Sequence, residues 1–294
     1  MYKMILVDLN QVMISNLMIQ LKRSDDGVVE EGLVRHMVLN SLKKYRGLFR
    51  PKYGELVICC DDTGYWRKDL FPYYKASRKK DRQTSSLDWN SIFVTLNNIR
   101  DELRENMPYL VIQVPHAEAD DIIATLCHEF GETNRDEGKP ILILSGDKDF
   151  VQLQKYWNVD NYNPILKKDV CVDNPERYLR EHIMLGDRGD GIPNFLSPDD
   201  TFVSGKRQKS ISRLKLAEWA ELEPEDFCTE EMLVGYMRNK ALVDLSEIPD
   251  DISGQVIEQY ARHHYSGTRN SRSKIIEYFM EKKLRNLMSD VQAF

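Results

Sequence analysis

The sequence predicts an α/β fold, in which a central and mostly parallel β-sheet is flanked by helices and followed by a helical C-terminal region. Two observations lead to this prediction. Up to about residue 176, short apolar runs of strand length alternate with segments of helical periodicity, which is the pattern of parallel, doubly wound sheets. Beyond that point the apolar spacing is that of helices alone.

Each predicted strand leads into acidic residues. The runs and their acids are residues 4–7 with Asp8, 56–60 with Asp61 and Asp62, 109–114 with Glu118, Asp120 and Asp121, and 141–144 with Asp147 and Asp149. The carboxyl ends of parallel strands lie along one edge of a sheet, where open α/β folds bind ligands. Carboxylates gathered there repel one another unless cations lie between them. Four separate helix caps are the alternative, but the doubled acids favour a shared site for hard divalent cations such as Mg²⁺ or Mn²⁺.

The remaining elements are predicted to be helices. Apolar residues recur at helical spacing over residues 11–22, 33–48, 89–103, 117–130, 211–222, 229–240, 252–264 and 273–288. Residues 67–84 differ, because they are polar and basic and lack an apolar stripe. We therefore expect an α/β domain over residues 1–180 and a helical domain over residues 181–294.

Composition narrows the class of protein. The chain has 294 residues, of which 41% are hydrophobic and 30% charged, as in ordinary globular proteins. Its apolar runs are too short to span a membrane, and Asp8 interrupts the first one, so a cytosolic protein without a signal peptide is expected. The five cysteines form no C-x-x-C pair and are expected to be buried, reduced thiols. The six histidines contain no i,i+4 pair, so a zinc site is not expected.

The charge is unevenly distributed along the chain. The net charge of −6 argues against a protein that coats nucleic acid nonspecifically. Residues 43–82, however, contain twelve Lys or Arg against five Asp or Glu, with aromatic residues between them, and residues 205–215 contain five bases and no acid. Basic stretches beside an acidic cation site suit a polyanionic substrate. Solvated helix faces are the alternative interpretation of any single basic run.

A glycine-rich loop occurs in the second half of the chain. Residues 185–193 read L-G-D-R-G-D-G-I-P, and such a loop can bring its backbone close to a ligand. Asp187 and Asp190 in this loop could complete the cation site. An ordinary Asp-Gly turn between helices is the alternative.

Six motifs occur together and in order. They are Asp8, C-D-D at 60–62, Y-K-A-S-R at 74–78, E-A-D-D at 118–121, S-G-D-K-D-F at 145–150 and G-D-R-G-D-G-I-P at 186–193. As a set they resemble the flap endonuclease and 5′-nuclease superfamily, which has a PIN-like α/β fold. Within it, G-Y-W-R at 64–67, Trp89 and the closing segment 274–294 resemble the ribonucleases H of T-even bacteriophages.

The resemblance implies roles for individual residues. The expected ligands of two divalent ions are Asp8, Asp61, Glu118, Asp120, Asp121, Asp147, Asp149, Asp187 and Asp190. Tyr74, Lys75 and Arg78 match a basic, catalytic gateway over the active site, within an arch or bridge near residues 62–90. On a helix, Lys75 and Arg78 would share one face. The expected contacts with nucleic acid are Arg67, Lys68, Lys79, Lys80, Gly189, Gly191, Ile192, Lys206, Arg207 and Lys209.

The C-terminal region is expected to contain a helix-hairpin-helix-like element that binds duplex. Asp187 and Asp190 match the acids of the loop that opens it. Two departures occur there: Gly191 stands where the family usually has Asn, and Ser204-Gly205-Lys206 stands where it usually has G-I-G-x-K-T. They leave open whether this chain has the monovalent-ion site that relatives often form at the hairpin.

The implied function is that of an enzyme, a divalent-metal-dependent 5′→3′ exonuclease and flap endonuclease acting on RNA–DNA and DNA duplexes. Two Mg²⁺ ions, replaceable by Mn²⁺, would serve hydrolysis, and the cellular task would be removal of RNA primers from lagging-strand fragments. A monomer in the cytoplasm, of the host cell if the chain is phage-encoded, is expected, with a single-strand-binding protein and a sliding clamp as candidate partners. Two alternatives remain: a catalytically silent DNA-binding scaffold, and an aspartyl-phosphate-type phosphatase, although Asp8-Leu9-Asn10 lacks the second acid of D-x-D.

Overall fold

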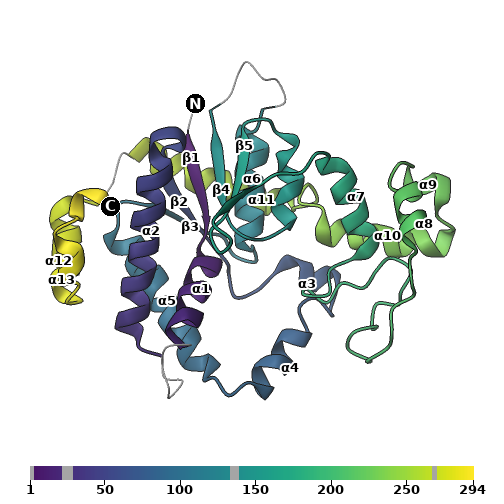
Figure 1. The fold of residues 1–294 in the computed structure, drawn as a ribbon, viewed down its shortest axis with the longest axis horizontal. Coiled ribbons are helices and arrows are strands. Elements are labelled where there is room, and N and C mark those ends of the chain that lie inside the picture. The colour runs from purple at the N-terminus through teal and green to yellow at the C-terminus, as the bar shows by residue number, and fades with distance from the viewer. Residues whose placement is uncertain (1–2, 22–28, 133–138, 267–269) are drawn as a thin grey trace.

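The computed structural model describes residues 3–21, 29–132, 139–266 and 270–294 (Figure 1). Its centre is a six-stranded sheet of order β3-β2-β1-β4-β5-β6, in which only β6 runs antiparallel to its neighbour. The strands are β1 (Met4–Asp8), β2 (Glu55–Cys60), β3 (Leu110–Gln113), β4 (Ile141–Leu144), β5 (Val159–Asn163) and β6 (Lys168–Val170). The predicted mostly parallel sheet flanked by helices is confirmed.

Two strands, β5 and β6, were not predicted, and the burial pattern of β5 shows the reason. β5 and β6 form one edge of the sheet. Buried and accessible residues alternate along β5, so its sequence V-D-N-Y-N lacks the continuous apolar run that marks a strand covered on both faces. The central strands β1 and β4, by contrast, are buried along their whole length.

Alternate residues of the central strands face two different cores. Ile5 and Val7 of β1 pack with α1 (Leu9–Leu21), α2 (Glu31–Tyr53) and α5 (Trp89–Asn106). Met4 and Leu6 pack on the opposite face with α6 (Ala119–Phe130) and α11 (Asp250–Ser266). The period of two follows from the pleat of a strand, and it gives a three-layered body of helix, sheet and helix.

A third core lies to one side of the sheet (Figure 1). It is built by α7 (Pro175–Leu185), α8 (Arg213–Trp219), α9 (Pro224–Phe227) and α10 (Glu230–Val243), together with Phe71 and Tyr74 from the basic stretch. Within it the rings of Trp219 and Phe227 stack with centroids 5.3 Å apart. The long connection from α7 to α8, residues 186–212, consists of turns and one isolated bridge between Asp187 and Ile192. The expected helix-hairpin-helix-like element stays a prediction.

The last part of the chain returns to the sheet. Residues from Leu245 to Tyr260 join the core of α6, and α12 (Arg272–Glu281), α13 (Arg285–Met288) and the terminal Phe294 join the core of α2 and α5. The chain after residue 245 therefore contributes to both faces of the α/β body. The division into domains at residue 180 stays a prediction.

The basic stretch around residues 66–84, which lacks an apolar stripe, contains two helices, α3 (Trp66–Leu70) and α4 (Ser77–Thr84). Two local predictions need correction. The helix expected over 273–288 is broken into α12 and α13 where Lys283 adopts a positive φ of 56°. Cys171 is exposed and Cys228 half-buried, so only Cys59, Cys60 and Cys127 are the buried thiols that were expected. None of the helices in the described part of the chain combines the length and the apolar character needed to cross a lipid bilayer.

The loop after α7 is held in place by α10. The Nδ2 atom of Asn239 donates to the carbonyl oxygens of Ile183, at 2.7 Å, and Pro193, at 2.9 Å. One turn earlier in α10, Gly235 lies against the carbonyl of Phe195, where a Cβ atom would come within 1.9 Å of the oxygen. This close approach fixes the spacing between α10 and the segment that follows the loop.

Gly235→Ala is therefore expected to destabilise the fold by about 1–3 kcal/mol, because the added methyl group must push α10 away from Phe195. Urea denaturation measures the loss. Gly254→Ala in α11 is the matched control, since a Cβ there meets nothing within 4 Å, and it should leave stability unchanged or raise it by about 0.5–1 kcal/mol. Equal effects of the two substitutions would contradict the close packing at Gly235.

Candidate active site

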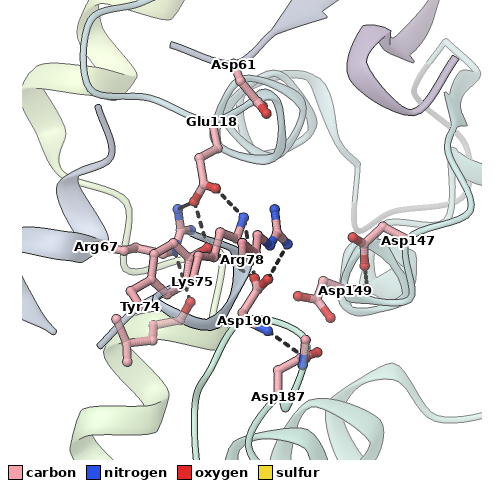
Figure 2. A network of polar contacts seen from close by, with 12 residues as sticks. Asp61, Arg67, Tyr74, Lys75, Arg78, Glu118, Asp147, Asp149, Asp187 and Asp190 are labelled. Carbon is pink, nitrogen blue, oxygen red and sulfur yellow. Dashed lines mark hydrogen bonds and ion pairs between the residues drawn. The ribbon is translucent and has the colours of Figure 1, made fainter. Parts of the chain in front are cut away.

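The predicted carboxylates gather beyond the carboxyl edge of the sheet. β2, β1 and β4 are neighbours, so Asp61, Asp8 and the pair Asp147 and Asp149 reach the same place. Figure 2 shows Asp61, Glu118, Asp147, Asp149, Asp187 and Asp190 around one space. Asp120 belongs to the same group, because the charges of Asp147 and Asp8 lie near enough to raise the pKa of its carboxyl. We call these acids, together with Asp8, the acidic centre.

Burial and mutual repulsion disfavour ionisation at the middle of the acidic centre. Burial, followed by the charge of Asp61, raises the pKa of Asp8 to about 7. Burial, followed by Asp149, raises the pKa of Asp147 to about 6. Burial and Asp147 raise the pKa of Asp120 well above its usual range. Divalent cations would remove this repulsion and restore the ionised forms, so the donor set fits such ions.

Polar neighbours orient two of the acids, and of these Asn10 and Gln11 lie outside the motifs. Asp8 accepts from the backbone N–H of Gln11 and from Ser145 Oγ, each at 3.0 Å. Asp61 accepts from the backbone N–H of Ala119 at 2.7 Å and from the side-chain amide of Asn10. These bonds hold the two carboxylates at fixed angles even though their charges repel.

A lysine and an arginine meet the opposite side of the acidic centre. Lys75 Nζ pairs with Glu118 Oε1 and lies 3.5 Å from Asp190 Oδ2, and Arg78 pairs with Asp190 at 2.7 Å (Figure 2). Burial would raise the pKa of Glu118, but Lys75 and then Arg67 lower it below its usual value. Glu118 is therefore held ionised beside a buried ammonium group.

The backbone places Lys75 in a way that its spacing from Arg78 did not predict. Lys75 has a positive φ of 54°, and its N–H donates to the carbonyl oxygen of Asp190 at 2.7 Å. Helix α4 begins only at Ser77, so Lys75 and Arg78 do not share a helix face. Their side chains meet through Asp190 instead.

Three expected site residues lie beneath the acidic centre. Arg67 has only 2% of its surface exposed, and it bonds the carbonyl oxygen of Leu242 at 3.0 Å, Glu118 at 3.1 Å and Asp121 at 2.8 Å. This burial contradicts the expected contact of Arg67 with nucleic acid. Asp121 is fully buried, and its Oδ2 accepts from Trp66 Nε1 and from the backbone N–H of Glu118, which caps α6. Its expected metal-binding role stays a prediction.

Tyr74 is the third of these buried residues. It is 3% exposed, and its hydroxyl donates to Glu118 Oε2 at 2.8 Å. The hydroxyl also lies 3.2 Å from Asp190. Tyr74 therefore positions Glu118, and its expected catalytic role stays a prediction.

The glycine-rich loop uses its own backbone donors. The N–H of Gly189 donates to Asp187 Oδ1, that of Gly191 to the carbonyl oxygen of Arg188 and that of Ile192 to the carbonyl oxygen of Asp187. The side chain of Ile192 is buried in the third core. The expected phosphate contacts of Gly189, Gly191 and Ile192 through these N–H groups are thus not supported. Gly191 has a φ of +77° and a Cβ there would lie 2.9 Å from the carbonyl oxygen of Tyr73, which explains glycine at this position.

The other expected contacts with nucleic acid are on the surface. Lys68, Lys79, Lys206, Arg207 and Lys209 are exposed. Lys206 pairs with Asp200 at 2.9 Å and Lys209 approaches Glu231 at 3.9 Å, so their charges are partly balanced. The side chain of Lys80 lies outside the described residues. Contacts of these residues with nucleic acid stay predictions.

A cavity of about 730 Å³ adjoins Asp61 and Lys75. Basic side chains from the stretch that carries α3 and α4 line one part of it, and apolar and aromatic side chains of α1 and α5 line another. The lining includes Lys68, Arg78, Arg82, Tyr65, Trp89 and Phe93. Cations beside aromatic rings are the surface on which single-stranded nucleic acid binds.

His182 is a member of the site that sequence reasoning missed. It lies in the last turn of α7, with Nε2 2.9 Å from Asp149 Oδ1 and 3.9 Å from Asp187 Oδ2. A lone histidine has no spacing pattern, so the only sequence signal was its place just before Gly186 and Asp187. Within the described chain, His182 Nε2 and Asp149 Oδ1 are buried atoms that have no hydrogen-bond partner, which suits atoms that bind an ion.

Comparison with known proteins assigns the chain to a family. Residues 3–182 match a family model described as the N-terminal resolvase-like domain of 5′-3′ exonucleases. The chain belongs to the 5′-3′ exonuclease family. Residues 174–294 match a second model, described as the C-terminal part of T4 RNase H. The resemblance to the 5′-nuclease superfamily and the expectation of a nuclease are confirmed by this membership.

Individual relatives agree with it. The chain is 32% identical to the ribonuclease H of Enterobacteria phage T4 over 300 residues, which cover 98% of this chain and 95% of that protein. It shares its fold with the T5 flap endonuclease solved in a complex with DNA and metal ions, at a TM-score of 0.60, 12% identity and coverage of 88% and 98%. It also matches the T5 5′-exonuclease with bound divalent zinc, at a TM-score of 0.58, 14% identity and coverage of 89% and 99%.

The raised pKa values predict a pH effect on the metal-free protein. Asp8 and Asp147 hold protons in the folded state at pH values at which the unfolded chain has released them. Proton binding therefore stabilises the folded state relative to the unfolded chain, and this stabilisation is lost as the pH rises through 6 to 7. With chelator present, lowering the pH from 8 to 6 should raise the free energy of unfolding by about 1–2 kcal/mol. Asp8→Asn should remove most of this gain in a denaturation series.

Asp62→Asn is the control for this experiment. Burial would raise the pKa of Asp62, but the backbone N–H groups of His116, Thr63 and Gly64 lower it below its usual value. Asp62 therefore does not titrate between pH 6 and 8, and its substitution should leave the pH dependence intact. A pH dependence that survives in Asp8→Asn would show that Asp8 does not hold the proton.

Proposed function

We propose that this chain is a divalent-metal-dependent 5′→3′ exonuclease and flap endonuclease that hydrolyses phosphodiesters of RNA–DNA and DNA duplexes. One observation carries the proposal: carboxylates from three neighbouring strands meet Lys75 and Arg78 at one edge of the sheet, beside a basic and aromatic cavity. Family membership supports the nuclease class. The polarity of cleavage and the choice of substrate are the part that we propose.

The acidic centre would hold two Mg²⁺ ions, with Mn²⁺ as a substitute. Its candidate ligands are Asp8, Asp61, Glu118, Asp120, Asp147, Asp149, Asp187 and Asp190. When bound, such ions polarise the scissile phosphate, lower the pKa of a bound water and stabilise the leaving oxygen. The buried, mutually repelling acids Asp8, Asp120 and Asp147 support this assignment, because the protein supplies them with too little positive charge of its own.

Lys75 and Arg78 would neutralise the substrate from the opposite side. Lys75 is mostly buried and is paired with Glu118, so its ammonium is already desolvated and oriented before substrate binds. A preorganised cation of this kind stabilises negative charge that develops on the phosphate. Arg78 is about half exposed and therefore meets the incoming strand first.

The cavity suggests how a strand approaches. A single strand beside α4 would place its phosphates near Lys68, Arg78 and Arg82 and its bases near Tyr65 and Trp89. The basic and aromatic lining suits single-stranded nucleic acid, so the proposal places a free 5′ strand in the cavity at the cleavage point. The exposed Lys206, Arg207 and Lys209 are the proposed contacts with the duplex behind it.

The proposed task in the cell is removal of RNA primers from lagging-strand fragments during replication. The similarity to a phage ribonuclease H over nearly the whole chain supports it. A phage-encoded protein would act as a monomer in the cytoplasm of its host. A single-strand-binding protein and a sliding clamp are the proposed partners at the fork.

A cleavage assay tests the proposal directly. The substrates are a 5′-labelled flap and a nicked RNA–DNA duplex, each incubated with Mg²⁺ and with chelator. We expect cleavage from the 5′ side with Mg²⁺ and none with chelator. Duplex binding without Mg²⁺-dependent cleavage would indicate a silent scaffold instead, and hydrolysis of small phosphate esters would indicate a phosphatase.

Asp147→Asn is expected to abolish cleavage while leaving duplex binding largely intact. The substitution removes one charge of the ion site and leaves the exposed basic residues in place. Cleavage under saturating Mg²⁺ and binding by fluorescence anisotropy measure the two effects. Asp160→Asn is the control, because Asp160 lies on β5 and pairs with Lys52, outside the acidic centre. Near-normal cutting by Asp147→Asn would contradict the site.

Lys75→Ala is expected to lower single-turnover cleavage by about a hundredfold or more at saturating enzyme, the effect of one lost electrostatic contact. The reason is that Lys75 faces the acidic centre and not the solvent. Lys68→Ala is the matched control, since Lys68 lines the same cavity but is exposed, and saturating enzyme should restore its rate. If saturation restores Lys75→Ala as well, the lysine only binds substrate.

A further inference from the structure

His182 is placed against the acidic centre by the end of α7. Only 7% of its surface is exposed. One ligand atom each from His182, Asp149 and Asp187 lie within 4.8 Å of one another. The closest pair is Nε2 and Asp149 Oδ1 at 2.9 Å, and Asp187 Oδ2 lies 3.9 Å from Nε2.

The contact between His182 and Asp149 lies at ion-pair distance but lacks the geometry of a hydrogen bond. The two atoms are close enough for one, yet both are buried and neither is hydrogen-bonded to any residue that the structure describes. Buried polar atoms are rarely left in this state unless another partner binds them. Around one ion with bonds of about 2.1 Å, neighbouring ligand atoms lie roughly 3 Å apart and opposite ones roughly 4 Å apart. The two distances match this arrangement.

Lys148 lies on the solvent side of the same place. Its Nζ atom lies 2.8 Å from Asp187 Oδ2, and its side chain is 54% exposed. The ammonium group thus neutralises Asp187 from the solvent side and can withdraw into water. The side chain of His182 in α7 is buried, so it cannot move into the solvent in the same way.

We propose that His182 supplies a nitrogen ligand to the divalent ion bound by Asp149 and Asp187, and that this nitrogen makes the site favour Mn²⁺ and later first-row ions over Mg²⁺. The inference rests on the proposed function and deepens it. Mg²⁺ binds oxygen ligands and retains water, whereas imidazole suits transition ions. A site with one nitrogen and two carboxylates is therefore more selective than the all-oxygen remainder of the acidic centre.

Electron paramagnetic resonance of bound Mn²⁺ tests the ligand in the natural protein, without reference to activity. Spin-echo modulation should show coupling to a histidine nitrogen. His182→Gln should abolish the coupling, and His36→Gln, which removes an imidazole from α2, should keep it. Titration should show Mn²⁺ affinity weakened by about tenfold or more in His182→Gln, with Mg²⁺ affinity changed much less.

The outcomes separate this inference from the proposed function. Bound Mn²⁺ without nitrogen coupling in the natural protein overturns the role of His182 and leaves metal-dependent cleavage standing. Equal losses of Mn²⁺ and Mg²⁺ affinity in His182→Gln also overturn it, because they show a histidine that only orients Asp149. A natural protein that binds no Mn²⁺ and cleaves nothing overturns both proposals.

Discussion

The repulsion among buried carboxylates at the edge of the sheet is the constraint on which the rest of the site depends. Asp8, Asp120 and Asp147 lie close together, and burial together with their mutual repulsion raises the pKa of each carboxyl. Hydrogen bonds from Gln11 and Ser145 orient Asp8, and hydrogen bonds from Asn10 and Ala119 orient Asp61. A cluster of carboxylates of this kind suits divalent cations, which would remove the repulsion.

Three cationic side chains meet Glu118 and Asp190 at the acidic centre. Arg67 and Lys75 hold Glu118 ionised, while Arg78 meets Asp190. Because Arg67 is buried and tied to the carbonyl of Leu242, the arrangement also couples the α/β body to the third core. Phe71 and Tyr74 in that core anchor the basic stretch at its base. The position of Lys75 thus depends on two layers of packing.

The C-terminal part of the chain serves the site as a support. α10 holds both ends of the glycine-rich loop through Asn239, and α7 brings His182 under Asp149. The loop satisfies its own backbone donors, which makes it a rigid carrier of Asp187 and Asp190. Helix α11 packs on one face of the sheet, and α12 and α13 pack on the other. The end of the chain therefore stabilises the strands that lead into Asp8 and Asp61.

The sequence by itself determined the parallel sheet, four of its strands and the acids at their ends, because a strand buried on both faces leaves a continuous apolar run and the carboxyl ends of neighbouring strands share one edge. It did not reveal β5, whose residues alternate in burial, or α3 and α4 in the basic stretch, which have no apolar stripe. Only the tertiary structure decided which charges face the site. Arg67 and Asp121 are turned inward to pair with each other, Lys75 reaches Glu118 from a left-handed backbone, and His182 arrives from another helix. Direction and burial of a side chain depend on contacts far apart in the chain, and no local pattern encodes them.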